Sequence, residues 1–442
     1  MRRKKKLLII LVIIGVVIVT PVVLWTIWCW SAERQFQAKL DDLRKRGEPV
    51  TLAEMAPPEV AEDQNAALLY ERAFALMTPM PDERLQWFRA LLRKSEALDA
   101  KEIGEAKELL SANGAALALI RQAVGKPQCR FPLSYNSPSE WGMAFKHLAG
   151  LQNAGRLLRL SAVVNQTEGR DSEAVRDCLS LLKLSRAVHD EPFTLSLQVE
   201  LFLSNSALTQ LRSVMTAREL PEGTCREILD GLRDPSYRAR FVRTVKGTRC
   251  SSLALLQMHL KDPTTIPLSF EPSGPYVGRV SAVVFKPHFY SQATECLRFL
   301  EKNDALAGIP WRQARTGWQQ MMDDLGGRPV WRMILISGMV CWVDKLSEGV
   351  DLRAAQWECG RTAVALRLFE IRHGEYPDKL GSLVPEFLDK LPVDPFSGKE
   401  YVYRKEGKGF ILYSLGDNLA DDGGVENPRA PETSDIVWKC SR

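Results

Sequence analysis

Residues 7–30 read LLIILVIIGVVIVTPVVLWTIWCW, a run of 24 residues without a charged side chain. A helix of that length, rising about 1.5 Å per residue, spans the ~30 Å hydrocarbon core of a bilayer with some tilt. Trp25, Trp28 and Trp30 cluster at its end, where indole rings favour the membrane interface. The run therefore predicts a transmembrane helix over residues 7–30, and the lipid bilayer is the first partner we expect.

The charges before this run set the expected orientation. Residues 2–6 read RRKKK, and basic residues next to a membrane helix tend to stay in the cytoplasm. We expect a single-pass protein of the bacterial inner (cytoplasmic) membrane, with its body in the periplasm or outside. The alternative is a cleaved signal peptide, which has an apolar region of about 7–15 residues followed by small residues. This run is longer and ends in Trp28-Cys29-Trp30, which favours an uncleaved anchor.

The rest of the chain carries no net charge. Of its 442 residues, 59 are Lys or Arg and 54 are Asp or Glu, and without the five N-terminal basic residues the two counts are equal. Nucleic-acid binding needs a basic field over a whole face, so we expect no nucleic-acid partner. With 45% hydrophobic and 26% charged residues, the chain can bury a core and is not disordered.

Helical periodicity dominates as far as residue 262. Residues 31–46 predict a charged helix that carries the chain away from the membrane. Further apolar stripes at helical spacing predict amphipathic helices over 61–77, 85–98, 102–124, 144–167 and 195–215. Another helix is predicted between Gly169 and Pro192, with its stripe formed by Ala174, Cys178, Leu181, Leu182 and Ala187. Gly169 ends one of them, Asp171 or Ser172 can cap the next, and together they form a helical hairpin similar to a single tetratricopeptide unit. The first exported domain is therefore expected to be α-helical.

Two later features divide the remaining chain. Four prolines within residues 262–275 mark the main internal break. A second apolar stretch at 333–343 has only 11 residues, so it predicts a buried helix and not a second span. We divide the chain into a cytoplasmic tail (1–6), a transmembrane helix (7–30), an exported α-helical domain (31–262), a connecting region of loops and helices (263–350) and a C-terminal domain (351–442).

The sequence pattern changes from helical to partly β-forming in the C-terminal domain. Residues 352–372 predict an amphipathic helix. Residues 401–403 and 410–414 are rich in β-formers and flank KEGKG, which predicts a β-hairpin, and SDIVW at 434–438 predicts a last short strand. The expected fold class is mainly α: an N-terminal transmembrane helix, a helical body, and a small α+β domain with a helix and an antiparallel sheet.

Several short motifs in this domain occur in a fixed order: HGEYP, DPFSG, YVY, SLG, GG and DI, at residues 373–377, 394–398, 401–403, 414–416, 423–424 and 435–436. In this order they resemble the C-terminal domain of the major pseudopilin of type II secretion systems. The whole chain also resembles uncharacterised membrane-anchored bacterial proteins that carry this module after a helical body. The chain departs from pseudopilins in lacking the prepilin leader, so we do not expect ordinary pilin assembly.

The resemblance implies a calcium ion in the acidic loop around residues 416–424. Calcium takes about 6–8 oxygen ligands from carboxylates, amides and backbone carbonyls, and the implied side-chain ligands are Asp417, Asn418, Asp421, Asp422 and Asp435. The spacing is not that of an EF-hand. The alternative is a solvated acidic turn beside Gly423-Gly424.

No catalytic motif stands out. The sequence contains no Gly-x-Ser-x-Gly, His-Glu-x-x-His or phosphate-binding loop, and its five histidines are isolated. Ser180-x-x-Lys183 matches a penicillin-binding motif whose other elements are missing or in the wrong order. The nine cysteines contain no Cys-x-x-Cys, so they suggest neither a dense disulfide scaffold nor a zinc ribbon.

The function we expect is a non-catalytic, membrane-anchored protein of the cell envelope that serves as an interaction or assembly module. It would have a protein partner in the envelope and a link to type II secretion-like machinery. The alternative is an exported hydrolase with a dispersed active site, because catalytic groups need only converge in space.

Overall fold

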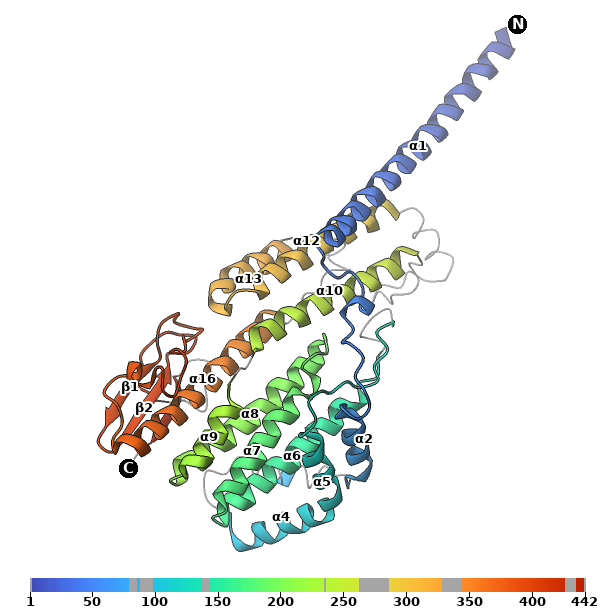
Figure 1. The fold of residues 1–442 in the computed structure, drawn as a ribbon. Coiled ribbons are helices and arrows are strands. Elements are labelled where there is room, and N and C mark those ends of the chain that lie inside the picture. Colours follow the sequence, from blue (N-terminus) through green and yellow to red (C-terminus); the bar gives the residue numbers. More distant parts are fainter. Residues whose placement is uncertain are drawn as a thin grey trace.

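A computed structural model gives the fold, and it describes residues 2–78, 86–87, 98–136, 143–233, 236–261, 286–327, 343–425 and 435–440. One long helix leaves a helical body at one end, and a small sheet covers the other end of the body (Figure 1). The chain is mainly α-helical, with one N-terminal apolar helix and a C-terminal three-stranded sheet, so this coarse part of the predicted fold class is confirmed.

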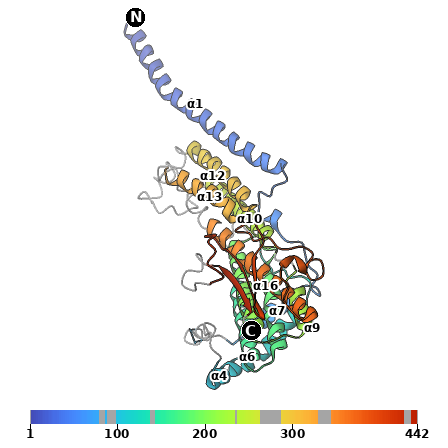
Figure 2. The same ribbon diagram turned by 90° about the vertical axis from the view of Figure 1, so that its left-hand side faces the viewer.

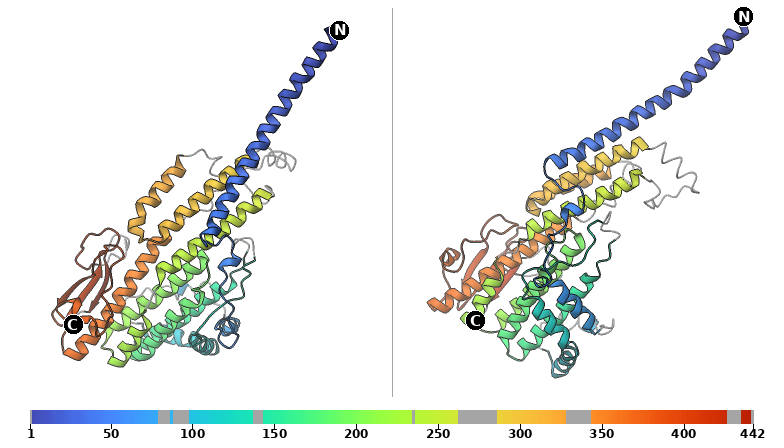
Figure 3. Two further views of the ribbon diagram at one scale, coloured as in Figure 1. Left: turned by 45° about the horizontal axis from the view of Figure 1, so that its top comes forward. Right: turned by 45° about the vertical axis from the view of Figure 1, so that its right-hand side comes forward.

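The described helices follow one another in chain order: α1 (Arg2–Lys45), α2 (Ala67–Leu76), α4 (Ala100–Ala112), α5 (Gly114–Ala123), α6 (Lys146–Thr167), α7 (Asp171–Ser185), α8 (Thr194–Ala217), α9 (Glu222–Gly231), α10 (Tyr237–Lys261), α12 (Lys286–Ala307), α13 (Trp311–Gly326) and α16 (Val343–His373). Short 3-10 turns lie at Ala53–Met55, Arg186–Val188 and Leu380–Leu383. Figure 2 shows α12 between α1 and α10. The views in Figure 3 show α1, α12 and α10 running roughly side by side.

The hairpin of α6 and α7 lies where the sequence predicts it. Gly169 has a φ of +78°, the left-handed conformation that glycine adopts at a helix end. The expected cap is wrong, because Asp171 is already the first helical residue and Arg170 precedes it without a side-chain cap. Helix α8 then packs on α7, and their buried leucines form the main core of the body.

One predicted helix is interrupted. The segment 102–124 forms α4 and α5 with a break at Asn113, whose side-chain amide donates to the Leu109 carbonyl (2.9 Å) and whose Oδ1 accepts from the Thr78 amide (3.0 Å). An asparagine side chain that bonds local backbone competes with helical hydrogen bonds. Where α4 begins, Asp99 and Glu102 form a reciprocal capping box.

Helix α16 begins at Val343, earlier than the predicted start at residue 352, so the expected domain boundary at 351 falls inside it. It packs on α8, α9, α10 and α13 on one side and on strands β2 and β3 on the other. One continuous hydrophobic cluster therefore runs from Leu151 in the helical body to Trp438 in the sheet.

The sheet has the order β1-β2-β3, formed by Val402–Glu406, Gly409–Ser414 and Ile436–Cys440, and both pairings are antiparallel. Glu406 pairs with Gly409, and Gly407 has a φ of +58° in the two-residue turn. The predicted hairpin is confirmed. The break at 262–275, Cys341, most of the 85–98 helix, all but one residue of the 333–343 stretch and Ser434 lie outside the described residues.

Two helical glycines allow a matched test of this packing. A Cβ on Gly247 of α10 would overlap the Pro192 backbone, whereas a Cβ on Gly104 of α4 would meet nothing within 4 Å. We expect Gly247→Ala to lower the free energy of unfolding by about 1–3 kcal/mol through overpacking. We expect Gly104→Ala to raise it by about 0.5–1 kcal/mol through helix propensity. Denaturant unfolding of the full chain in detergent measures both, and shifts of the same sign would contradict the packing.

Candidate functional site

The first notable feature is the N-terminal part of α1, which projects from the helical body. Large apolar side chains are exposed along most of the helix from Val16 to Trp30, with Val17 at 64% and Trp30 at 61%. Soluble monomers seldom expose an apolar patch of this extent. The apolar stretch of α1 that follows Gly15 is only 6% buried against the body. By length and composition this helix can cross a membrane or serve as a signal sequence, and no other described helix is both long and apolar enough to do so.

The second half of α1 is docked on the body. Ala32, Phe36, Leu40 and Leu43 follow one another at helical spacing, are at most 4% exposed and pack in one cluster with α12. The Phe36 ring meets Tyr290 edge-on at 6.2 Å. The charged helix predicted over residues 31–46 is present, but it does not stand away from the body. Its apolar stripe lies between charged residues, and the charges alone suggested a solvated stalk.

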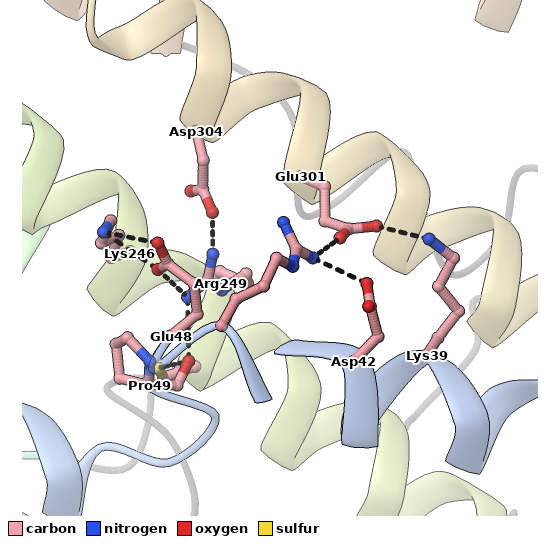
Figure 4. A network of polar contacts seen from close by, with 10 residues as sticks. Lys39, Asp42, Glu48, Pro49, Lys246, Arg249, Glu301 and Asp304 are labelled. Carbon is pink, nitrogen blue, oxygen red and sulfur yellow. Dashed lines mark hydrogen bonds and ion pairs between the residues drawn. The ribbon is translucent and has the colours of Figure 1, made fainter. Parts of the chain in front are cut away.

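Ion pairs hold the C-terminal end of α1 against α12 (Figure 4). Glu301 of α12 accepts from Lys39 Nζ at 3.3 Å and from the Arg46 guanidinium, which also lies 3.2 Å from an Asp42 oxygen. These groups are a third to a half exposed on the α1 side. Pairs of this kind contribute little stability individually, but here they fix where α1 ends on α12.

A buried arginine extends the cluster into α10. Arg249 is 1% exposed and donates to Asp304, to Glu48 Oε2 (3.1 Å) and to the Pro49 carbonyl (2.9 Å). Burial would raise the pKa of Glu48, but hydrogen bonds from Lys246 and Arg249 outweigh burial and hold that pKa below its ordinary value. We call the eight charged residues of Figure 4 the junction cluster: Lys39, Asp42, Arg46, Glu48, Lys246, Arg249, Glu301 and Asp304.

The acidic loop at the far end of the body and Asp435, which directly precedes β3, form the candidate metal site, and Asp435 is its buried residue. Asp435 is 2% exposed, and its Oδ2 accepts from the Gly424 amide at 2.8 Å. Its Oδ1 is buried and has no hydrogen-bond partner among the described residues. Burial raises the pKa of Asp435, and the negative charges of Asp422 and Asp421 raise it further, while the backbone amides of Gly424 and Val425 offset part of this rise. A buried carboxylate of this kind is a place where a cation would be favourable.

Three further predicted ligands lie in the same loop. Asp421 Oδ1 accepts from the Tyr413 hydroxyl (2.7 Å) and the Gly423 amide (2.9 Å), which hold the Asp421 pKa below its ordinary value. Asn418 Oδ1 accepts from the Ala420 amide at 3.1 Å, and its Nδ2 lies 3.5 Å from Asp422. Asp421 and Asp422 lie close enough to Asp435 for their negative charges to raise its pKa.

Asp417 points elsewhere. Its Oδ1 lies 3.5 Å from an Arg315 guanidinium nitrogen of α13, and Arg315 also stacks over the Trp311 ring at 5.2 Å. The structure therefore divides the predicted ligands: Asp421, Asp422 and Asp435 share one electrostatic neighbourhood, with Asn418 beside Asp422, and Asp417 pairs with a helix of the body.

The loop has the donor chemistry of a calcium site, with carboxylate and amide oxygens only. The unpartnered Asp435 Oδ1 fits a cation at this point. As the side chains lie, however, no group of three or more His, Cys, Asp or Glu among the described residues is close enough together to hold a metal ion. The residues that would hold calcium are Asp435, Asp421 and Asp422, and binding would require their carboxylates to draw closer.

Buried polar groups elsewhere serve the fold. Glu191 lies between Ser196, which donates to it, and His147, whose Nε2 is 2.9 Å from the carboxylate. All three are at most 7% exposed. A serine nucleophile needs the histidine next to it, so this order does not make a catalytic triad. Ser180 donates to the Arg176 carbonyl and lies with Lys183 along an open groove between α7 and α9.

Asp394, the first residue of the DPFSG motif, has a structural role that the sequence analysis did not assign. Asp394 is 1% exposed and accepts from the Phe396 amide (3.1 Å), the Ser397 amide (3.2 Å) and the Ser414 hydroxyl (2.8 Å). It closes the DPFSG turn and ties that turn to β2. The signal was available, because Asp before a Pro-x-x-Gly sequence is a typical turn residue.

Comparison with known proteins adds no identity, because no family model, no curated protein and no solved structure matches this chain. The described contacts therefore carry the functional argument.

The junction cluster yields a stability prediction. Arg249→Ala leaves Asp304 without its buried arginine partner, while Glu48 keeps Lys246; breaking one side of a buried ion pair costs about 3–5 kcal/mol. The matched control is Arg233→Ala, because Arg233 pairs with Asp230 while both side chains are more than 60% exposed, and such pairs contribute about 0–1 kcal/mol. Denaturant unfolding of the full chain measures both variants, and equal losses would show that the cluster does not stabilise the junction.

Proposed function

We propose that this protein is a non-catalytic, membrane-anchored component of the bacterial cell envelope whose exported helical body acts as an interaction or assembly module. The observation that carries the proposal is α1: its large apolar side chains are exposed from Val16 to Leu24 and again at Ile27, Trp28 and Trp30, and the helix is then docked on the body from Ala32 onward. A helix built in this way joins a bilayer to a folded domain without a flexible linker.

The C-terminal module supports the interaction part of the proposal. Val393 and Val425 are 61% and 62% exposed, among the most exposed large apolar side chains described outside α1. The module also carries the motifs that resemble the type II major pseudopilin. We propose that it contacts a protein of the envelope linked to type II secretion-like machinery, and that calcium stabilises its acidic loop.

Topology is the first test. With the basic residues 2–6 in the cytoplasm, a periplasm-active reporter fused after Arg442 should be active, and a cytoplasm-active reporter at the same point should be silent. The protein should also remain in the membrane fraction after alkaline extraction. The reverse reporter pattern contradicts the orientation, and a soluble mature form that begins near Ala32 contradicts the anchor.

The interaction is tested by a photo-cross-linking residue placed at Val393 or Val425 in living cells. We expect a discrete adduct with an envelope protein from these positions. The control position is Lys101 on α4, whose side chain is 85% exposed and lies on the helical body. A module without a protein partner gives no adduct from Val393 or Val425, or the same diffuse pattern as Lys101.

Calcium is tested with Asp435→Asn, which keeps an oxygen for the Gly424 amide. The folded pKa of Asp435 is raised, so its contribution to stability is full below the unfolded pKa of about 3.9 and is lost as pH rises through the folded pKa. At neutral pH in chelator, the variant should therefore melt at a higher temperature than the wild type. Calcium should stabilise the wild type by about 2.7 kcal/mol at 100 times the dissociation constant, and should not stabilise the variant.

The control for charge alone is Asp389→Asn, because Asp389 is exposed in the same module. It should leave the calcium response unchanged. If calcium and chelator give one melting temperature for the wild type, the loop is a solvated acidic turn.

A further inference from the structure

We propose that three cationic side chains, Arg34, Lys261 and Lys286, bind the phosphate headgroups of the bilayer and hold the end of α10 and α12 against the membrane surface. We call these three residues the basic collar. The inference rests on the proposed membrane anchor and adds a second contact with the same bilayer, made by the folded body.

The start of α12 lies beside the point where α1 would leave the membrane. Cys29 is 9% exposed, α1 packs along α12, and Lys286 is the first described residue of α12. One turn further, the Tyr290 hydroxyl donates to Glu33 at 3.2 Å. These contacts place the first turn of α12 next to Trp28 and Trp30, the residues that mark the membrane interface.

The end of α10 reaches the same level. Leu256 of α10 is buried in one cluster with Ala32 of α1 and Tyr290 of α12, and Leu260 packs against that cluster. Lys261 follows as the last residue of α10 and is exposed. In Figures 1 and 3 the end of α10 and the start of α12 lie together on the side toward which α1 projects.

The collar cations differ from those of the junction cluster in having no carboxylate partner among the described residues. Arg34 stacks over the Trp30 ring at 5.1 Å, and Lys286 Nζ lies 5.8 Å from the Tyr290 ring. The neighbouring acid, Glu33, accepts a hydrogen bond from Tyr290. An anion on this side would satisfy all three.

Lipid phosphate is the anion that fits this position. The three side chains are exposed or partly exposed and do not enclose a single phosphate ion. In the proposed anchored state, however, α1 holds them beside the bilayer surface, where lipid phosphate groups are always present. Basic side chains next to an anionic membrane each strengthen surface binding by about fivefold, and the attraction falls off within a Debye length. The interaction should therefore depend on lipid charge and on salt.

The experiment is amine-reactive labelling of the full chain in lipid nanodiscs, read by peptide mass spectrometry. Discs of a neutral phospholipid are compared with discs that contain an anionic phospholipid. We expect Lys261 and Lys286 to react about fivefold more slowly in the anionic discs, and to regain their rates in about 1 M salt, where the Debye length is roughly 3 Å. The internal controls are Lys379, Lys390 and Lys408, which are exposed in the C-terminal module and should react equally in both discs.

A second readout is hydrogen exchange in the first turn of α12. In anionic discs, the variant Arg34→Gln/Lys261→Gln/Lys286→Gln should exchange faster there than the wild type. The matched variant Lys379→Gln/Lys390→Gln/Lys408→Gln removes the same charge elsewhere and should not. Protein that fails to co-elute with discs overturns the anchor itself. Protein that co-elutes but shows no difference between discs for Lys261 and Lys286 overturns the collar and leaves the anchor intact.

Discussion

Helix α16 is the element on which the rest of the body depends. Trp357, at its centre, donates to the Leu232 carbonyl at 2.9 Å and meets the Tyr237 ring edge-on. Asp351 accepts from Arg238 of α10 and from the Trp311 amide of α13 (2.6 Å), so that one carboxylate joins three helices. Burial raises the pKa of Asp351, and the two donors partly offset that cost. On the other side, Gly360 lets the Trp438 ring of β3 lie directly on the helix.

This arrangement explains why the sheet and the helical body share one core. A three-stranded sheet alone buries little apolar surface, and small sheets need a helix to pack against. Here the helix that supplies this surface also packs on α8, α9 and α10. Arg212 of α8 donates to the Val437 carbonyl at 2.8 Å, which adds a direct contact between the body and β3. The C-terminal module therefore shares one hydrophobic core with the helical body, although its sequence has a different, partly β-forming pattern.

Sequence periodicity and turn chemistry were enough for the elements whose signals are local. The α6–α7 hairpin, α8 and the β1–β2 hairpin follow from apolar stripes, Gly169 and the KEGKG turn. The docking of α1 on α12 could not be predicted, because Phe36 and Tyr290 are far apart in sequence and the charges of residues 31–46 obscure the apolar stripe. The split at Asn113 depends on a contact with Thr78, which no local pattern shows.

The candidate site shows the same limit. The acidic loop was found by resemblance, yet only contacts across the fold reveal that Asp417 turns toward Arg315 while Asp435 is buried with an unpartnered oxygen. Residues of one motif can thus separate in space when a helix from elsewhere in the chain offers a cation. Burial, which raises the pKa of Asp435, is set by the packing of the last strand and is not written in the loop itself.

The continuity of α1 has a mechanical consequence. The same helix that would cross the bilayer runs unbroken into the junction cluster, where α10 and α12 clamp it. A transmembrane helix adjusts its tilt to the thickness of the surrounding bilayer. In the proposed anchored state the part of α1 that follows Pro21 continues as one helix onto the body, so the body would swing with the tilt of that part as the arm of a lever. The height and angle at which the C-terminal sheet meets a partner would then follow from the thickness of the membrane.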